Sequence, residues 1–201
     1  MQEEHTTEII LNMLAGTSTR DISMRKILIL QGSPRRNGNT AALAASFARG
    51  AEDAGHTVTE IFLQDKQISD CLGCCACQKN GGQCIQGDDM EEIYTAMLES
   101  DVIVLASPVY FYTWTATMKR ALDRTFAIEE ALTGKTFYLL STGAAPEEGC
   151  MAHMLESFRL YVDCFADNKI GGYLFGCDTR EPEDIQGKPV LDRAYDMGKK
   201  L

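Results

Sequence analysis

The feature of this sequence that most constrains its fold is a regular alternation of short apolar runs with longer helix-forming stretches, which begins at Arg25. The first run, over residues 26–31, reads Lys-Ile-Leu-Ile-Leu-Gln. A continuous apolar run that alternates with helices is typical of a strand buried on both faces of a sheet. Similar runs recur along the chain. We therefore expect strands over 26–31, 58–63, 101–107, 136–141 and 170–175, and helices over 40–54, 88–100, 113–132, 150–165 and 190–200.

Five strand–helix repeats predict the α/β class, with a five-stranded parallel sheet, helices on both of its faces and right-handed crossovers. The 201 residues suffice for one domain with a substantial core. We place this domain at residues 25–201 and treat 1–24 as an N-terminal extension. Within the extension, residues 8–14 could form two turns of amphipathic helix that docks on the body or on a partner chain, and a frayed extension is the alternative.

Charge and hydropathy exclude several kinds of partner. The chain has 19 basic and 29 acidic residues and no basic stripe, which argues against binding to nucleic acid or to an anionic membrane. No apolar run approaches the roughly 20 residues that span a bilayer. The N-terminus carries two glutamates where a secretory signal would be basic, so we expect a cytoplasmic protein with reduced cysteines.

In parallel α/β sheets, ligands bind beyond the carboxyl ends of the strands. The segment after the first expected strand reads GSPRRNGNT (32–40). Its glycines allow backbone N–H groups to turn inward, the following helix N-terminus favours an anion, and Arg35 can add a charged hydrogen bond. This turn suits one terminal phosphate. It matches neither of the common nucleotide-binding glycine motifs, and a plain turn with an N-cap at Asn39 is the alternative.

Two further segments follow later strands. Residues 107–114, SPVYFYTW, place four aromatic side chains within five positions, which favours a planar ring system, although Phe111 and Trp114 could instead pack in the core or at a subunit interface. The turn STGA (141–144) is small enough for backbone N–H groups to approach a ring carbonyl, unless it is only a connecting turn. A phosphate, a planar ring and N–H donors together describe flavin mononucleotide (FMN).

At this point the sequence resembles the flavodoxin-like NAD(P)H-dependent FMN reductases, including the iron–sulfur flavoproteins. The matching stretches are 32–40, CLGCCACQKNGGQCIQGDDM (71–90), SPVYFYTWTATMKRALDR (107–124) and 141–144. The resemblance implies a flavodoxin-like three-layer sandwich of strand order 2-1-3-4-5 with FMN at the switch point. This sequence departs from the family pattern at Ala116 and Ala144, where glycine is usual.

The resemblance also implies which residues bind the cofactor. The FMN phosphate would be held by Ser33, Arg35, Asn39 and Thr40, and Asn37 is assigned to the cofactor site with them. The isoalloxazine ring would lie along Pro108, Val109, Tyr110 and Phe111. Thr142 and Gly143 would approach the pyrimidine edge of the ring. No catalytic side chain is expected, because the flavin carries the hydride from NAD(P)H to a small acceptor such as a quinone.

Five of the eight cysteines fall within residues 71–84. In the iron–sulfur branch of the family, the spacing of Cys71, Cys74, Cys77 and Cys84 implies ligands of one [4Fe–4S] cluster. A zinc site, or reduced thiols in a loop that covers the flavin, stay open as alternatives. The remaining Cys150, Cys164 and Cys177 are expected to be small buried residues.

Three functions follow from these expectations. The first is an FMN-dependent oxidoreductase with a small-molecule acceptor. The second is an electron carrier in which the cluster passes electrons between a ferredoxin and the flavin. The third is a redox or metal sensor without turnover. Exposed aromatic residues after the third strand would need cover, so we expect a homodimer or homotetramer.

Overall fold

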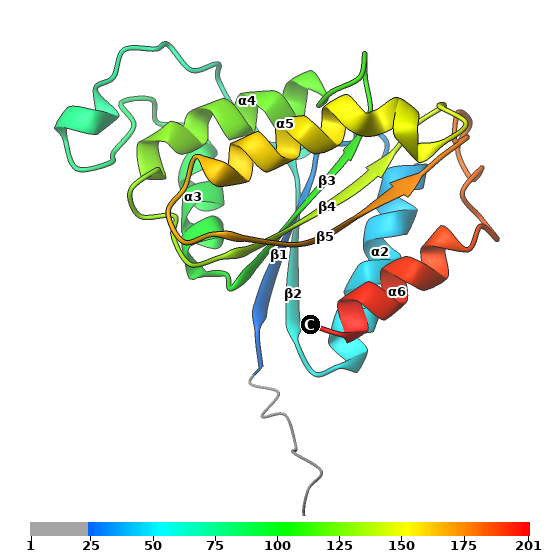
Figure 1. Ribbon diagram of the computed structural model, residues 1–201. Coiled ribbons are helices and arrows are strands. Elements are labelled where there is room, and N and C mark those ends of the chain that lie inside the picture. Colours follow the sequence, from blue (N-terminus) through cyan, green and yellow to red (C-terminus); the bar gives the residue numbers. More distant parts are fainter. Residues whose placement is uncertain (1–23) are drawn as a thin grey trace, which may run out of the picture.

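The computed structural model describes residues 24–201 (Figure 1). The expected helix at residues 8–14 lies outside this range. The described chain alternates strands with helices as predicted. The strands are β1 (Lys26–Gln31), β2 (Thr57–Phe62), β3 (Val102–Pro108), β4 (Thr136–Thr142) and β5 (Lys169–Gly176). The helices are α2 (Asn39–Asp53), α3 (Met90–Glu99), α4 (Ala116–Arg124), α5 (Ala152–Asp163) and α6 (Val190–Lys199).

The five strands form one sheet of order β2-β1-β3-β4-β5, and every neighbouring pair is parallel. This confirms the predicted flavodoxin-like sheet. Strand order reverses between β1 and β3, so the carboxyl ends of these neighbours form the topological switch point. The register aligns Gln31 of β1 with Ala106 of β3, and Pro108 of β3 with Thr142 of β4. The predicted ligand segments therefore emerge at one edge of the sheet.

Helices cover both faces of the sheet (Figure 1). On one face α2 and α6 pack over a core that includes Phe47, Val104 and Leu140. On the other face α3, α4 and α5 enclose a second core. β1 and β3 are buried on both sides because they lie between these layers, which explains their continuous apolar runs. Within the described residues, no helix is long and apolar enough to cross a membrane.

The main difference from the expected elements lies between β3 and β4. We predicted one helix over 113–132, but α4 covers only Ala116–Arg124 and a 3₁₀ turn follows over Thr125–Ile128. The helix begins late because Thr115 is its N-cap, its side chain accepting a hydrogen bond from the Met118 N–H. The residues before Thr115 are used instead in a tight turn described below.

A second correction concerns the cysteines outside the 71–84 cluster. Cys150 and Cys164 are exposed and Cys177 is partly exposed, so the expectation that they are buried is wrong. Cys150 lies in the 3₁₀ turn before α5, and Cys164 is the C-cap of α5, both at helix ends where the chain faces solvent. All eight cysteines are free thiols.

Candidate functional site

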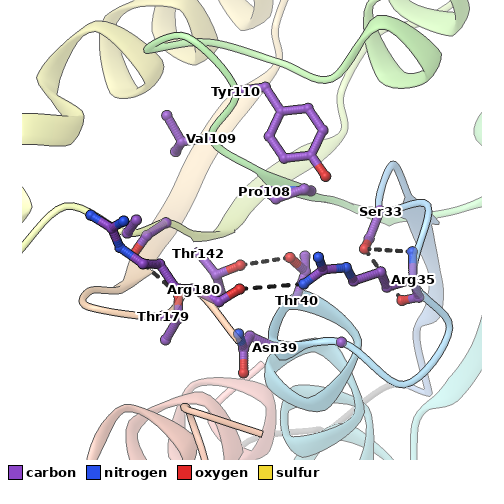
Figure 2. A pocket seen from close by; sticks show the side chains of 13 residues that line it. Ser33, Arg35, Asn39, Thr40, Pro108, Val109, Tyr110, Thr142, Thr179 and Arg180 are labelled. Atoms are coloured by element: carbon purple, nitrogen blue, oxygen red, sulfur yellow. Dashed lines mark hydrogen bonds between the residues drawn. The ribbon is translucent and has the colours of Figure 1, made fainter. Parts of the chain in front are cut away.

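A cavity of about 200 Å³ opens at the carboxyl ends of β1, β3, β4 and β5 (Figure 2). It brings together all of the predicted cofactor residues except two. Asn37 and Phe111 are both exposed and lie outside its lining. The lining comprises Ser33, Arg35, Gly38, Asn39, Thr40, Pro108, Val109, Tyr110, Thr142, Gly143, Ala144, Thr179 and Arg180.

The floor of the cavity is the turn from β1 into α2. Gly38 is the N-cap of α2 and makes no side-chain cap, and the first turn of the helix carries no acidic residue. The first N–H groups of the helix are therefore open to an anion. Buried Thr40 lies beside them, with its hydroxyl 2.7 Å from the hydroxyl of Thr142 on β4. Ser33, also buried, fixes the turn by accepting a hydrogen bond from the Arg35 N–H at 3.1 Å.

The two arginines of this turn point in different directions. Arg35 lines the cavity and its Nη1 donates to the carbonyl oxygen of Arg180 at 3.3 Å (Figure 2). Arg36 instead forms an ion pair with Asp65 and lies over the ring of Phe62. Arg35 thus adds positive charge to the cavity and Arg36 does not line it.

The side chain of Asn39 is hydrogen-bonded to the wall of the cavity. Its Nδ2 donates to the Glu181 carbonyl oxygen at 2.8 Å, and its Oδ1 accepts from the Ile185 N–H at 3.1 Å. These bonds tie α2 to the loop that follows β5. The predicted role of Asn39 as a phosphate ligand stays a prediction, and the structure adds a positioning role.

The loop after β5 contributes two lining residues that the sequence analysis missed, Thr179 and Arg180. The Thr179 hydroxyl lies 3.1 Å from the Gly143 carbonyl oxygen and 3.0 Å from the Gly176 carbonyl oxygen, either of which can accept its proton, and the Gly143 N–H donates to the Gly176 carbonyl oxygen at 3.0 Å. The Gly143 N–H is therefore already paired within the protein, and the predicted approach of Thr142 and Gly143 to the flavin ring stays a prediction. The sequence signal for these residues is a polar segment directly after the fifth strand, in the same place as the three predicted ligand segments that follow β1, β3 and β4.

The aromatic segment forms a two-residue turn at the rim of the cavity. Tyr110 and Thr113 exchange backbone hydrogen bonds of 3.0 and 3.1 Å, and the residues between them, Phe111 and Tyr112, have φ of 47° and 71°. Bulky residues rarely adopt this left-handed conformation, and such strain gathers at functional sites. The turn holds Phe111 98% exposed, whereas Trp114 is buried and its Nε1 donates to Ser157.

The cysteine segment projects from the sheet edge beyond α3 and α4 (Figure 1). A small cavity of about 40 Å³ is lined by Cys71, Cys74, Cys75, Cys77 and Cys84, with no carboxylate or histidine in its lining. Across the described residues, no three ligating side chains converge as they would around a single ion. The metal-ligating side chains of the lining are nevertheless cysteines alone, which fits a soft metal centre such as an iron–sulfur cluster.

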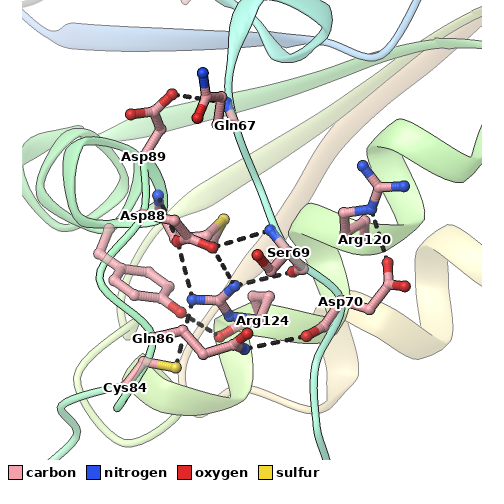
Figure 3. Close-up of polar contacts among 11 residues, drawn as sticks. Gln67, Ser69, Asp70, Cys84, Gln86, Asp88, Asp89, Arg120 and Arg124 are labelled. Carbon is pink, nitrogen blue, oxygen red and sulfur yellow. Dashed lines mark hydrogen bonds and ion pairs between the residues drawn. The ribbon is translucent and has the colours of Figure 1, made fainter.

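A buried ion pair lies where the two ends of the cysteine segment meet, at Ser69 and Asp88 (Figure 3). We call this place the neck of the segment. Arg124, at the end of α4, donates to both carboxylate oxygens of Asp88 at 2.8 and 3.1 Å. Burial opposes the ionisation of Asp88, but hydrogen bonds from Arg124, Ser69 and Met90 outweigh it and hold the pKa of this carboxyl below its usual value. Tyr94 donates to the Arg124 carbonyl oxygen at 2.8 Å, and burial raises the pKa of Tyr94 to about 12.

Residues 25–166, which make up most of the described domain, match the model of a family described as "NADPH-dependent FMN reductase". The chain belongs to this family. The family match confirms the predicted resemblance and places the protein among FMN-dependent oxidoreductases, which use FMN and NAD(P)H. The open end of α2, the buried hydroxyls of Ser33 and Thr40 and the side chain of Arg35 fit the FMN phosphate.

Relatives of this FMN reductase family member include iron–sulfur flavoproteins. The chain is 39% identical over 184 residues to one from Methanocaldococcus jannaschii, covering 88% of this chain and 95% of that protein. It is 40% identical over 101 residues to one from Archaeoglobus fulgidus, which covers 50% of this chain and 45% of that protein, so this match spans less than half of the relative. Its fold resembles the NAD(P)H:quinone oxidoreductase from Methanothermobacter marburgensis, with a TM-score of 0.73 at 17% identity, covering 89% and 98% of the two chains.

Proposed function

We propose that this chain transfers hydride from NAD(P)H, by way of bound FMN, to a small acceptor such as a quinone. The observation that carries the proposal is the open N-terminus of α2 facing a cavity that is also lined by the half-buried Pro108 and Val109 and the exposed Tyr110. FMN, when bound, supplies the redox chemistry, and the protein supplies binding and orientation.

Each part of the cavity has a task under this proposal. The α2 N–H groups, the Ser33 and Thr40 hydroxyls and Arg35 would bind the phosphate. Pro108, Val109 and Tyr110 would lie along the ring. A cavity of about 200 Å³ is below the usual size for a complete cofactor site, so the ring would extend toward the open rim.

The neighbouring arginines provide a matched test. Arg35→Ala removes a charged hydrogen bond, which contributes about 1.5–3 kcal/mol when formed. Because Arg35 is exposed, we expect the lower end of this range, about a tenfold rise in the Kd for FMN, measured by quenching of flavin fluorescence. Arg36→Ala removes the same charge but does not touch the cavity, so its Kd should stay within about twofold of the wild type.

The assay of function follows the oxidation of NADPH and of NADH at 340 nm with a water-soluble quinone as acceptor. Turnover that requires FMN supports the proposal. A protein that binds no FMN, or an Arg36→Ala variant that loses as much affinity as Arg35→Ala, would contradict the assignment of the cavity. FMN binding without oxidation of either nucleotide would leave the cavity assignment intact and contradict the hydride reaction.

A second function, an iron–sulfur flavoprotein that carries electrons, is favoured by the cysteine cavity. Its lining offers sulfur ligands and one buried cation, with no carboxylate. We propose that Cys71, Cys74, Cys77 and Cys84 would hold a [4Fe–4S] cluster there, which would supply one-electron chemistry. Iron and acid-labile sulfide in protein purified without air test this, and their absence would favour an oxidoreductase with free thiols.

We also propose that the protein assembles as a homodimer or homotetramer. Phe111 and Tyr112 together form an exposed aromatic tip beside the cofactor cavity, held in a strained turn. A second copy that covers this tip would remove aromatic surface from water and close the rim around the ring. Light scattering of the wild type and of Phe111→Ser is the test, and a monomeric wild type would contradict the proposal.

A further inference from the structure

Arg124 is a buried cation that faces the cysteine cavity. Its side chain is 1% exposed, and the residue lines the cavity together with the five clustered cysteines. The guanidinium comes from the last residue of α4, so its position is fixed by a helix and not by the cysteine loop. Figure 3 shows it between the two ends of that loop.

The hydrogen bonds that the Arg124 side chain donates fall into two groups. The first group closes the loop neck: Nη1 and Nη2 donate to Asp88, and Nη1 also donates to the Ser69 carbonyl oxygen at 2.9 Å. The second is a single contact, from Nη2 to the Sγ atom of Cys84 at 3.4 Å. The Nε atom is buried and has no partner among the described residues.

The contact with Cys84 is not needed to close the neck. Asp88 alone already accepts both ends of the guanidinium fork, and it also accepts from the Ser69 and Met90 N–H groups. A second closure comes from Gln86, whose Nε2 donates to the Asp70 carbonyl oxygen. The Arg124–Cys84 contact therefore adds something different, a hydrogen-bond donor with positive charge aimed at one sulfur atom of the cavity.

We propose that Arg124 is a positioning residue of the cysteine site, which fixes Cys84 by its sulfur atom and makes a cluster bound at this site easier to reduce. The inference rests on the second proposed function, the iron–sulfur site. Reduction adds one electron to a centre held by negative thiolates. Hydrogen bonds to the sulfur ligands and nearby positive charge favour the reduced form.

The test compares variants of the full chain purified without air. Arg124→Lys keeps the charge but not the fork that reaches both Asp88 and Cys84. We expect its cluster to shift toward the oxidised form by about tenfold at a fixed potential, which is about 59 mV for one electron. Arg120→Lys is the matched control, because Arg120 pairs with exposed Asp70 of the same loop and touches no cysteine. Its midpoint potential should equal that of the wild type.

A measurement on the wild type covers the case in which Arg124→Lys fails to fold. Protein labelled with ¹⁵N-arginine and reduced with dithionite should show a ¹⁵N coupling to the paramagnetic cluster by pulsed electron paramagnetic resonance. The same coupling should persist in Arg120→Lys. This readout depends on the hydrogen bond itself, so a purely structural role of Arg124 would not produce it.

The outcomes distinguish a failure of the proposed iron–sulfur site from a failure of the proposed role of Arg124. A wild type without iron and sulfide would overturn the iron–sulfur site, and this inference with it. A wild type that holds the cluster, lacks the ¹⁵N coupling and keeps its potential in Arg124→Lys would overturn the role of Arg124 alone. An equal shift in Arg120→Lys would do the same, because the shift would then not depend on the contact with Cys84.

Discussion

Helices α2 and α6 are in backbone contact, and this contact gives a stability prediction whose size can be worked out. A Cβ atom added at Gly50 of α2 would lie 2.0 Å from the Tyr195 carbonyl oxygen of α6. A Cβ atom at Gly198 of α6 would lie 2.1 Å from the Phe47 carbonyl oxygen of α2. Since carbon and oxygen normally approach to roughly 3.3–3.6 Å, either alanine must separate the helices by more than about 1 Å.

Two opposing terms set the expected effect of Gly50→Ala. Alanine is favoured over glycine within a helix by roughly 1 kcal/mol. Overpacking a dense interface costs about 1–3 kcal/mol, and more where backbone must move, as it must here. We expect a net loss of about 2 kcal/mol in the free energy of unfolding, or roughly 4–8 °C in Tm for a chain of this length.

Urea unfolding followed by circular dichroism checks the prediction. Gly149→Ala is the control, because no atom lies within 4 Å of its added Cβ, and it should leave the midpoint unchanged or raised. The double variant Gly50→Ala/Gly198→Ala should lose less than the sum of the single losses, since the first methyl already separates the helices. A midpoint for Gly50→Ala at or above that of the wild type would refute the reasoning.

Three further results are expected. The pKa of Asp88 is lowered in the folded state, so its carboxylate stabilises the fold above about pH 4. This contribution is lost as pH falls through the folded pKa. Asp88→Asn should therefore flatten the dependence of the free energy of unfolding on pH in that range. Phe111→Gly should raise the free energy of unfolding by about 0.5–1 kcal/mol, because glycine relieves the strain of the left-handed φ. A lower unfolding midpoint than that of the wild type would show that the turn is unstrained. Thr115→Val should cost about 2 kcal/mol in urea unfolding, because it removes the α4 N-cap and the hydrogen bond to the Gly32 carbonyl oxygen.

Most of the fold could be predicted because the sheet is covered on both faces. β1, β3 and β4 had to be apolar almost throughout, and such runs are visible without knowledge of their neighbours. The phosphate turn was equally predictable, since it follows directly from the end of β1. Helix limits were harder: the late start of α4 depends on Thr115 reaching the Gly32 carbonyl oxygen, a contact between distant parts of the chain.

The polar partners within the site were the least predictable part. Asn39 stood in the right turn, yet its side chain is bonded to the loop after β5, about 140 residues further along. Nothing local distinguishes an asparagine that binds phosphate from one that braces a wall. The same limit applies to Arg124, whose ion pair with Asp88 and contact with Cys84 join residues 36 and 40 positions apart and form only in the folded chain.

Helix α4 links the two sites mechanically. Its N-cap, Thr115, bonds the Gly32 carbonyl oxygen in the phosphate turn, and its last residue, Arg124, closes the neck of the cysteine segment. The helix has nine residues and rises about 1.5 Å per residue, so these ends lie roughly 14 Å apart on one rigid element. A shift of the phosphate turn that moves Thr115 must therefore also move the guanidinium that contacts Cys84. For this reason a substitution at Thr115 should change the chemistry of the cysteine cavity as well as the binding of FMN, whereas an equally destabilising substitution between α2 and α6 should leave the cysteines unaffected.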